Sequence, residues 1–332
     1  MNGFKPSNTF NIRSSNMDKH LLSRRKFSGI AAGATLAAVH SQTAAVNSQT
    51  KNSPNSPAIQ DADVHALSAT KNIYKSVKWD MIDVEGTILD KFRLCQELGF
   101  DGMELSSPSN LAASEVNKAS EATGMPVHGV VDSKHWNFRL SSPDAKTRDQ
   151  GRGYLEQAIR DTRSFGGNSV LLVPGAVKGK DESHDHVWQR SIVEIRKVLP
   201  IASRLGVRIL IENVWNGFCE SPELFRDYLD EIDSPWVGIY FDIGNVRKFG
   251  SSENWVRTLG SRIVKLDVKD WGQKNGFCKI GEGDVNWPEV CKALTEIRFS
   301  GWSTAEVSGG GRDRLNDIAR RMDRVLELNK KA

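Results

Sequence analysis

Short apolar, β-branched runs alternate with longer stretches of helical periodicity along residues 71–332. The runs predict eight strands, at 73–82, 102–105, 127–131, 169–173, 208–211, 237–241, 263–268 and 302–306. Helices are expected near 86–98, 110–123, 148–165, 187–205, 221–232, 252–260, 287–297 and 312–329. Eight strand–helix units in this length predict an α/β fold, a single-domain (β/α)8 TIM barrel, because an open doubly wound sheet more often has about five or six strands.

The first 70 residues differ from the rest in composition. A basic segment with Arg24, Arg25 and Lys26 precedes a weakly apolar run at 29–39, which is shorter than the roughly 20 residues that cross a bilayer. The paired arginines resemble the twin-arginine signal, which exports proteins already folded. We therefore expect a twin-arginine-type signal peptide at 1–45, a disordered linker at 46–70, and the barrel at 71–332.

The expected signal implies a location outside the cytoplasm, periplasmic or extracellular, reached through the twin-arginine export machinery. No stable membrane insertion is expected after the signal is cleaved, because no other apolar stretch approaches membrane length. The alternative interpretation of 1–45 is a flexible basic tail.

The charge balance excludes one class of partner. The chain has 45 Lys and Arg against 41 Asp and Glu, a net charge of +4. Residues 1–45 hold six basic residues and one acidic residue, which leaves the remainder at (45 − 6) − (41 − 1) = −1. A nucleic-acid groove needs a cluster of surplus Lys and Arg, so we expect no nucleic-acid partner for the barrel.

Acidic residues follow the apolar runs of several strands, where a barrel carries its chemistry. They are Glu104, Glu212, Asp242, Asp267 and Glu306. Side chains alternate along a strand, so Lys265, Asp267 and Lys269 share a face, and the apolar Leu266 and Val268 between them must face the helices. The charged residues are therefore expected inside the barrel.

Four of these carboxylates, on the last four strands, predict a metal site: Glu212, Asp242, Asp267 and Glu306. Carboxylates gathered in a partly dry site raise one another's pKa unless a cation neutralises them. Oxygen ligands favour Mg²⁺ or Mn²⁺ over Zn²⁺, which prefers His and Cys. The alternative is an interior ion-pair network in which Lys265 and Lys269 neutralise the carboxylates.

Six segments together resemble the xylose isomerase-like TIM-barrel superfamily, and the resemblance covers most of 71–332. They are 97–104, 211–213, 241–245, 267–270, 281–287 and 301–306. The superfamily includes sugar isomerases, ketose 3-epimerases, inosose dehydratases and the endonuclease IV type of DNA-repair enzyme. The last branch is not favoured, because it uses a His-rich multi-zinc site and this barrel has four histidines.

The resemblance implies a metal held by Glu, Asp, His and Glu at four strand ends. Glu212, Asp242 and Glu306 match three of these positions, and Asp267 stands where the family usually has histidine. It also implies that Glu212 and Glu306 are an acid/base pair on opposite faces of the substrate.

The leading hypothesis is a metal-dependent sugar isomerase or epimerase that abstracts a proton next to a carbonyl and proceeds through an enediolate. A lyase or dehydratase on keto-sugars or 3-keto-glycosides could use the same enolate chemistry. A hypothesis of another class is a non-catalytic, exported carbohydrate-binding protein. The sequence does not indicate an oligomeric state.

Further residues are expected to contact the carbohydrate. These are His128, Trp136, Trp215, Lys269 and Glu104. His128 could bind a hydroxyl or assist proton transfer, or it could be a hydrogen-bonded residue of the barrel interior. The tryptophans, with Trp271, could stack on sugar rings or pack as a lid, and Lys269 could bind a substrate oxygen or pair with Asp267.

Overall fold

The computed structural model describes residues 72–328, which form a closed barrel of eight parallel strands. The barrel strands are β1 (Ile73–Lys78), β2 (Gly102–Ser107), β3 (Val127–Asp132), β4 (Ser169–Leu172), β5 (Arg208–Glu212), β6 (Val237–Asp242), β7 (Ile263–Val268) and β10 (Gly301–Ala305). They are hydrogen-bonded in the order β1-β10-β7-β6-β5-β4-β3-β2, with β1 closing on β2. The expected (β/α)8 barrel is confirmed.

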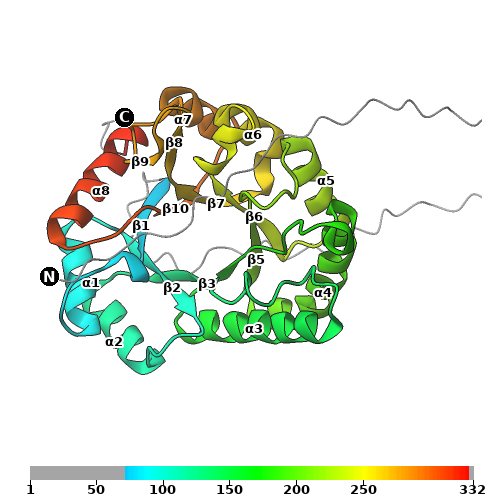
Figure 1. The fold of residues 1–332 in the computed structure, drawn as a ribbon. Coiled ribbons are helices and arrows are strands. Elements are labelled where there is room, and N and C mark those ends of the chain that lie inside the picture. Colours follow the sequence, from blue (N-terminus) through cyan, green and yellow to red (C-terminus); the bar gives the residue numbers. More distant parts are fainter. Residues whose placement is uncertain (1–71, 329–332) are drawn as a thin grey trace, which may run out of the picture. The chain divides into compact units, whose positions relative to one another are not determined.

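Eight α-helices form a ring outside the strands, and they follow the chain order around it (Figure 1). They are α1 (Ile88–Glu97), α2 (Ala113–Thr123), α3 (Ala145–Ser164), α4 (His184–Leu205), α5 (Pro222–Ile232), α6 (Ser252–Leu259), α7 (Trp287–Glu296) and α8 (Arg312–Val325). Short 3-10 helices are η1 (Trp79–Met81), η2 (Lys180–Glu182), η3 (Asn245–Lys248) and η4 (Gly260–Arg262). The helices begin within about three residues of the expected positions.

Side-chain caps explain where two of the longer helices begin. Asp144 accepts hydrogen bonds from the backbone N–H groups of Lys146 and Thr147, so α3 begins three residues before the expected position. Ser183 and His186 form a reciprocal capping box, and α4 begins correspondingly early. The caps satisfy backbone donors that the apolar periodicity does not reveal.

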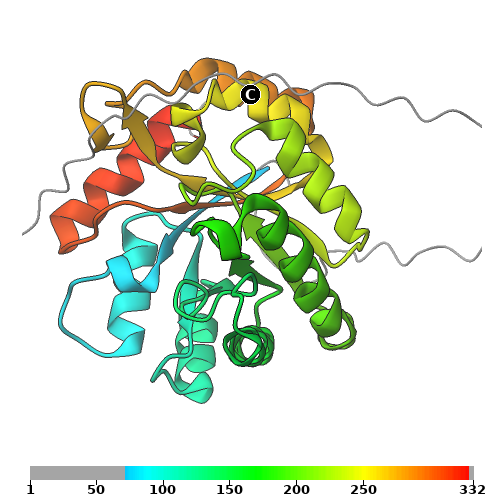
Figure 2. The same cartoon turned by 45° about the vertical axis from the view of Figure 1, so that its right-hand side comes forward.

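Two parts of the chain differ from the sequence-based expectation. The first strand was expected over 73–82, but β1 ends at Lys78 and η1 follows it. The connection from β7 to α7 contains an antiparallel hairpin of β8 (Asp270–Gly272) and β9 (Gly276–Cys278), which the sequence did not predict. Each hairpin strand has only three residues, too few to show an alternating pattern. Both views place the hairpin beside α8 (Figures 1 and 2).

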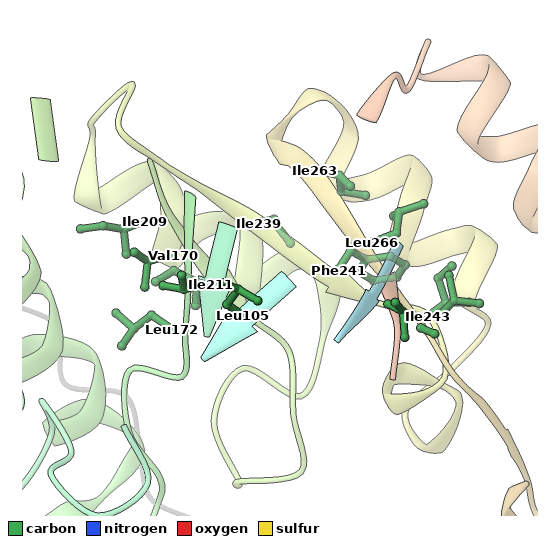
Figure 3. Close-up of a cluster of buried hydrophobic side chains, with 14 of the residues drawn as sticks. Leu105, Val170, Leu172, Ile209, Ile211, Ile239, Phe241, Ile243, Ile263 and Leu266 are labelled. Atoms are coloured by element: carbon green, nitrogen blue, oxygen red, sulfur yellow. The ribbon is translucent and has the colours of Figure 1, made fainter. Parts of the chain in front are cut away.

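Alternation along the strands separates a helix-facing core from the barrel interior. On β5, Ile209 and Ile211 belong to the main core, while Leu210 belongs to a separate interior cluster with Leu171 and Tyr240. Figure 3 shows part of the main core, in which apolar side chains from several strands lie together. The residue after Ile211 must therefore point into the barrel, as expected for Glu212.

The expected signal peptide at 1–45 and linker at 46–70 lie outside the described residues. Within 72–328, none of the helices combines the length and apolar character needed to span a bilayer.

Two glycines of α3 give a matched test of how the β3–α3 loop packs. A Cβ at Gly151 would overlap the backbone carbonyl of Phe138 in that loop, whereas a Cβ at Gly153 would meet open space. We expect Gly151→Ala to lower the free energy of unfolding by about 1–3 kcal/mol through overpacking. Gly153→Ala should raise it by roughly 0.5–1 kcal/mol, because alanine is the better helix former.

Denaturant unfolding of the two variants and the parent protein measures both effects. Equal stability of the two variants would show that the β3–α3 loop does not rest on α3 through Gly151.

Candidate active site

Acidic side chains converge at the carboxyl end of the barrel. Glu212 and Asp242 are the last residues of β5 and β6, Asp267 lies near the end of β7, and Glu306 directly follows β10. Glu212, Asp242 and Asp267 are buried, and the Glu306 side chain is 28% exposed. The expected placement of these four residues at one mouth is confirmed.

Three of the four carboxylates form a close group. One oxygen from each of Glu212, Asp242 and Glu306 lies within 4.8 Å of the others, the arrangement of a potential cation site among residues 72–328. Asp267, the fourth expected ligand, does not belong to this group. Its Oδ2 atom instead lies 3.1 Å from the Lys78 ammonium.

The backbone and an asparagine fix the orientation of Asp242. Its Oδ1 atom accepts hydrogen bonds from the N–H groups of Gly244 and Asn245, both at 2.8 Å. Asn213 exchanges two hydrogen bonds with the Asp242 backbone, which ties the end of β5 to the end of β6. These contacts leave Oδ2 directed at Lys269, whose Nζ atom is 3.0 Å away.

Lys78 is a central cation of the site, and the sequence analysis did not identify it. Its Nζ atom lies 3.1 Å from Asp267 Oδ2, 3.1 Å from Glu306 Oε1 and 3.5 Å from Glu104 Oε2. Strand alternation could have identified Lys78, because Ser76 and Lys78 are two residues apart on β1 and therefore share a face. Ser76 contacts interior residues of the barrel, so Lys78 also points inward. The assumed strand over 73–82 concealed that Lys78 is the last residue of β1.

Lys269 is the second cation. Its Nζ atom lies 2.6 Å from Glu306 Oε2 and 3.0 Å from Asp242 Oδ2, so it pairs with these carboxylates and not with Asp267. Lys265 was proposed as a partner of the carboxylates in the ion-pair alternative. It instead donates to the Nδ1 atom and the carbonyl oxygen of His128, at 2.8 and 2.7 Å.

Burial and the two lysines set the protonation of the site. Burial, reinforced by the charge of Glu306, raises the pKa of Glu212 well above its ordinary value. Burial also raises the pKa of Asp242 to about 6, although Lys269 opposes the change. Burial alone would raise the pKa of Glu306, but Lys78 and Lys269 outweigh it and hold this pKa below its ordinary value.

The same environment strengthens the basicity of Lys78. Burial would lower the pKa of its ammonium group, but the surrounding carboxylates, led by Asp267 and Glu306, hold the pKa well above its ordinary value. Lys78 is therefore charged at neutral pH, and it is held among the carboxylates by attraction to several of them.

His128 lies within a hydrogen-bonded chain of the barrel interior. Lys265 donates to its Nδ1 atom, so Nε2 carries the proton and donates to Ser76 Oγ at 2.7 Å. Burial, with the charge of Lys265, lowers the pKa of His128 well below its ordinary value. The ring also stacks on Trp302 at 4.7 Å, so both ring nitrogens and one face have protein partners.

His135 is a second residue of the mouth that the sequence analysis did not select. Its Nδ1 atom accepts a hydrogen bond from the Val173 N–H group, which leaves the proton on Nε2. Burial, followed by the charge of Lys78, lowers the pKa of His135 to about 3. His135 is therefore a neutral side chain with a fixed tautomer near the carboxylates.

Aromatic side chains lie in the segments that follow β3, β5 and β7 at the carboxyl end of the barrel. Trp215 is 38% exposed, stacks on Phe277 at 4.7 Å and meets Trp271 edge-on at 5.9 Å. Its Nε1 atom donates to the Asn245 carbonyl at 2.7 Å, which fixes the indole. Trp136 is 46% exposed and lies edge-on to His135, apart from this cluster.

The residues expected to contact the carbohydrate therefore differ in how accessible their side chains are to solvent. Glu104 is buried and faces Lys78, and Lys269 is held by two carboxylates. His128 lies in the hydrogen-bonded interior, whereas Trp136 and Trp215 are open to solvent.

Glu212, Asp242 and Glu306 fit a hard divalent cation, because they offer oxygen ligands alone. Asp267 Oδ1 is a buried acceptor without a hydrogen-bond partner in the described part of the chain, and a buried carboxylate oxygen of this kind suits a cation.

Sequence comparison finds relatives over most of the barrel. The chain is 27% identical over 228 residues to L-ribulose-5-phosphate 3-epimerase UlaE of Salmonella paratyphi A, covering 64% of this chain and 79% of the relative. It is 25% identical to the putative L-ribulose-5-phosphate 3-epimerase SgbU of Escherichia coli K12, covering 64% and 80%.

Solved structures share the fold at lower identity. D-psicose 3-epimerase of Clostridium cellulolyticum H10 superposes with a TM-score of 0.64 at 17% identity, covering 78% of this chain and 100% of that one. The 3-keto-D-glucoside 4-epimerase YcjR of E. coli gives 0.65 at 17% identity, covering 77% and 98%. The family model described as xylose isomerase-like TIM barrel matches residues 92–327. The chain therefore belongs to the xylose isomerase-like TIM barrel family, and it is a sugar isomerase/epimerase-like enzyme.

Proposed function

We propose that the protein is a metal-dependent sugar isomerase or epimerase that abstracts a proton from a carbon next to a carbonyl. The observation that carries the proposal is the convergence of Glu212, Asp242 and Glu306, with one oxygen of each within 4.8 Å, at the carboxyl end of the barrel. Three carboxylates at this spacing offer both a cation site and a base close to it.

Glu212 and Glu306 are the proposed acid/base pair. They lie on β5 and after β10, which are separated around the barrel by β6 and β7, so they approach a bound ring from different sides. One takes the proton, an enediolate forms, and the other returns a proton to the opposite face, which inverts the carbon. Lys269 contacts Glu306 and keeps that carboxylate directed into the mouth.

Glu212, Asp242 and Glu306 would hold the metal, with Asp267 beside them. When bound, the cation would withdraw charge from the substrate carbonyl and so make the neighbouring carbon more acidic. The neutral His135 offers a further N–H donor near the same carboxylates, suited to hold a substrate oxygen.

Glutamine in place of Glu306 should remove one proton-transfer group while keeping the side-chain shape. We expect Glu306→Gln and Glu212→Gln each to lower turnover by about 10²- to 10⁴-fold, the usual contribution of acid/base catalysis. Glu223→Gln, on the exposed side of α5, is the matched control and should leave turnover unchanged. A screen of keto- and aldo-sugars, read by deuterium uptake from solvent into the sugar, measures this.

The reaction products separate the alternatives. Deuterium uptake without loss of a leaving group supports the isomerase or epimerase, whereas elimination would assign the protein as a lyase. Full turnover in Glu306→Gln would refute the acid/base assignment. Sugar binding that is unchanged in the double glutamine variant, without any turnover in the parent, would identify a binding protein.

Metal binding can be measured without turnover. We expect the purified protein to bind Mn²⁺ in calorimetry, and Asp242→Asn to weaken this binding at least about tenfold, because one of three charged ligands is lost. Glu223→Gln again serves as the control. Equal Mn²⁺ affinity in the parent and in Asp242→Asn would place the ion elsewhere.

We further propose that the protein is exported by the twin-arginine pathway. The proposal rests on Arg24 and Arg25 ahead of a short apolar run, and export would favour substrates without a phosphate. Replacing both arginines by lysine should retain the full-length chain in the cytoplasm, as cell fractionation would show. Unchanged export of that variant would contradict the proposal.

A further inference from the structure

A cavity of about 460 Å³ adjoins the group formed by Glu212, Asp242 and Glu306. Its lining includes Lys269 and Glu306 from the carboxylate site, together with Phe277, Lys279, Ser308 and Arg314. The volume lies in the range of about 300–1,000 Å³ that is typical of small-molecule sites. Glu212 and Asp242 are not part of its lining, so the cavity extends the mouth beyond the three-carboxylate group.

The hairpin contributes an aromatic surface to this cavity. Phe277 on β9 is 51% exposed, and Trp215 stacks against it at 4.7 Å. Trp215 is in turn fixed by its hydrogen bond to Asn245 and by edge-on contact with Trp271. An exposed ring with this support suits contact with the apolar face of a sugar or with an aromatic group.

The hairpin is held in place by one buried carboxylate. Asp270, the first residue of β8, accepts hydrogen bonds from the N–H groups of Trp271 and Gly281 and from the indole of Trp287. These bonds fix both ends of the segment that carries Phe277. The hydrogen bonds to Asp270 therefore hold the aromatic surface in a defined position at the mouth.

Polar side chains form another part of the cavity lining. Lys279 is half-exposed, and its Nζ atom is 4.0 Å from Asp317. Arg314 donates to the Ser308 carbonyl and to Asp317. Together, Lys279 and Arg314 have more N–H donors than Asp317 and the Ser308 carbonyl can accept. Some of these donors can therefore bind the hydroxyls of a ligand.

We propose that this cavity is a second subsite, which binds the part of a glycoside beyond the reacting ring. The substrate class is then a glycoside or disaccharide in preference to a free monosaccharide. The inference rests on the proposed function, since it assigns the reacting ring to the carboxylates. Glu306 belongs both to the carboxylate group and to the cavity lining, so a ring at the carboxylates would have its substituent next to the cavity. Contacts made there would increase kcat/KM through binding energy remote from the reacting carbon.

The test compares two substrates with the same reacting ring: 3-keto-glucose and its p-nitrophenyl glycoside, both followed by deuterium uptake. We expect the parent enzyme to favour the glycoside at least about tenfold in kcat/KM, and Phe277→Ala to lose most of this preference. The ratio of the two kcat/KM values is the readout, because the Phe277 ring also lies 5.2 Å from Lys269 Nζ and its loss can change both values together. Leu224→Ala, an exposed apolar residue on α5, is the control and should change neither value.

Equal kcat/KM for the two substrates in the parent, or equal losses on both in Phe277→Ala, would overturn the subsite. If neither probe exchanges its proton, the screen of keto- and aldo-sugars decides the proposed function, and the subsite is judged by binding alone. Calorimetry would then compare p-nitrophenyl glucoside with glucose. Tighter binding of the glycoside that is lost in Phe277→Ala supports the subsite, and equal binding of both sugars refutes it.

Discussion

The placement of buried carboxylates around two lysine ammonium groups is the constraint on which the site depends. Five acidic side chains meet at one end of a closed barrel, and four of them are buried. Lys78 and Lys269 lie among them, within hydrogen-bonding distance of Asp267, Asp242 and Glu306. Charges in such a position are stable only when opposite charges or donors lie close by, so the lysines are as necessary to the mouth as the carboxylates.

Strand alternation explains both the success and the failure of the sequence-based predictions. The apolar Ile209 and Ile211 fix the direction in which Glu212 points, so its place could be predicted without coordinates. The same rule correctly predicted that the Lys265 side chain points into the barrel, but not how far along the barrel axis it lies. Lys265 contacts His128, and Lys78 is the lysine that lies beside Asp267 among the carboxylates. Depth depends on the stagger between strands, which the sequence of one strand does not contain.

The remaining features could not be predicted because they depend on contacts between distant segments. The hairpin of β8 and β9 is too short for a periodic pattern, and it is held by Asp270 through donors as far along the chain as Trp287. The exclusion of Asp267 from the close carboxylate group likewise follows from its contact with Lys78, 189 residues away in sequence. Local pattern identifies strands and their faces, whereas long-range pairing decides which charges meet.

The charge count of the mouth bears on what it can bind. With all groups ionised, the five carboxylates exceed the two lysines by three negative charges. Protonation relieves part of this excess, as the raised pKa values of Glu212 and Asp242 indicate. A divalent cation relieves it without protonation and would leave one negative charge, so the same carboxylates stay available as bases. The two lysines alone do not balance the site, and this charge balance supports the proposed cation and a neutral sugar over an anionic substrate held by the carboxylates.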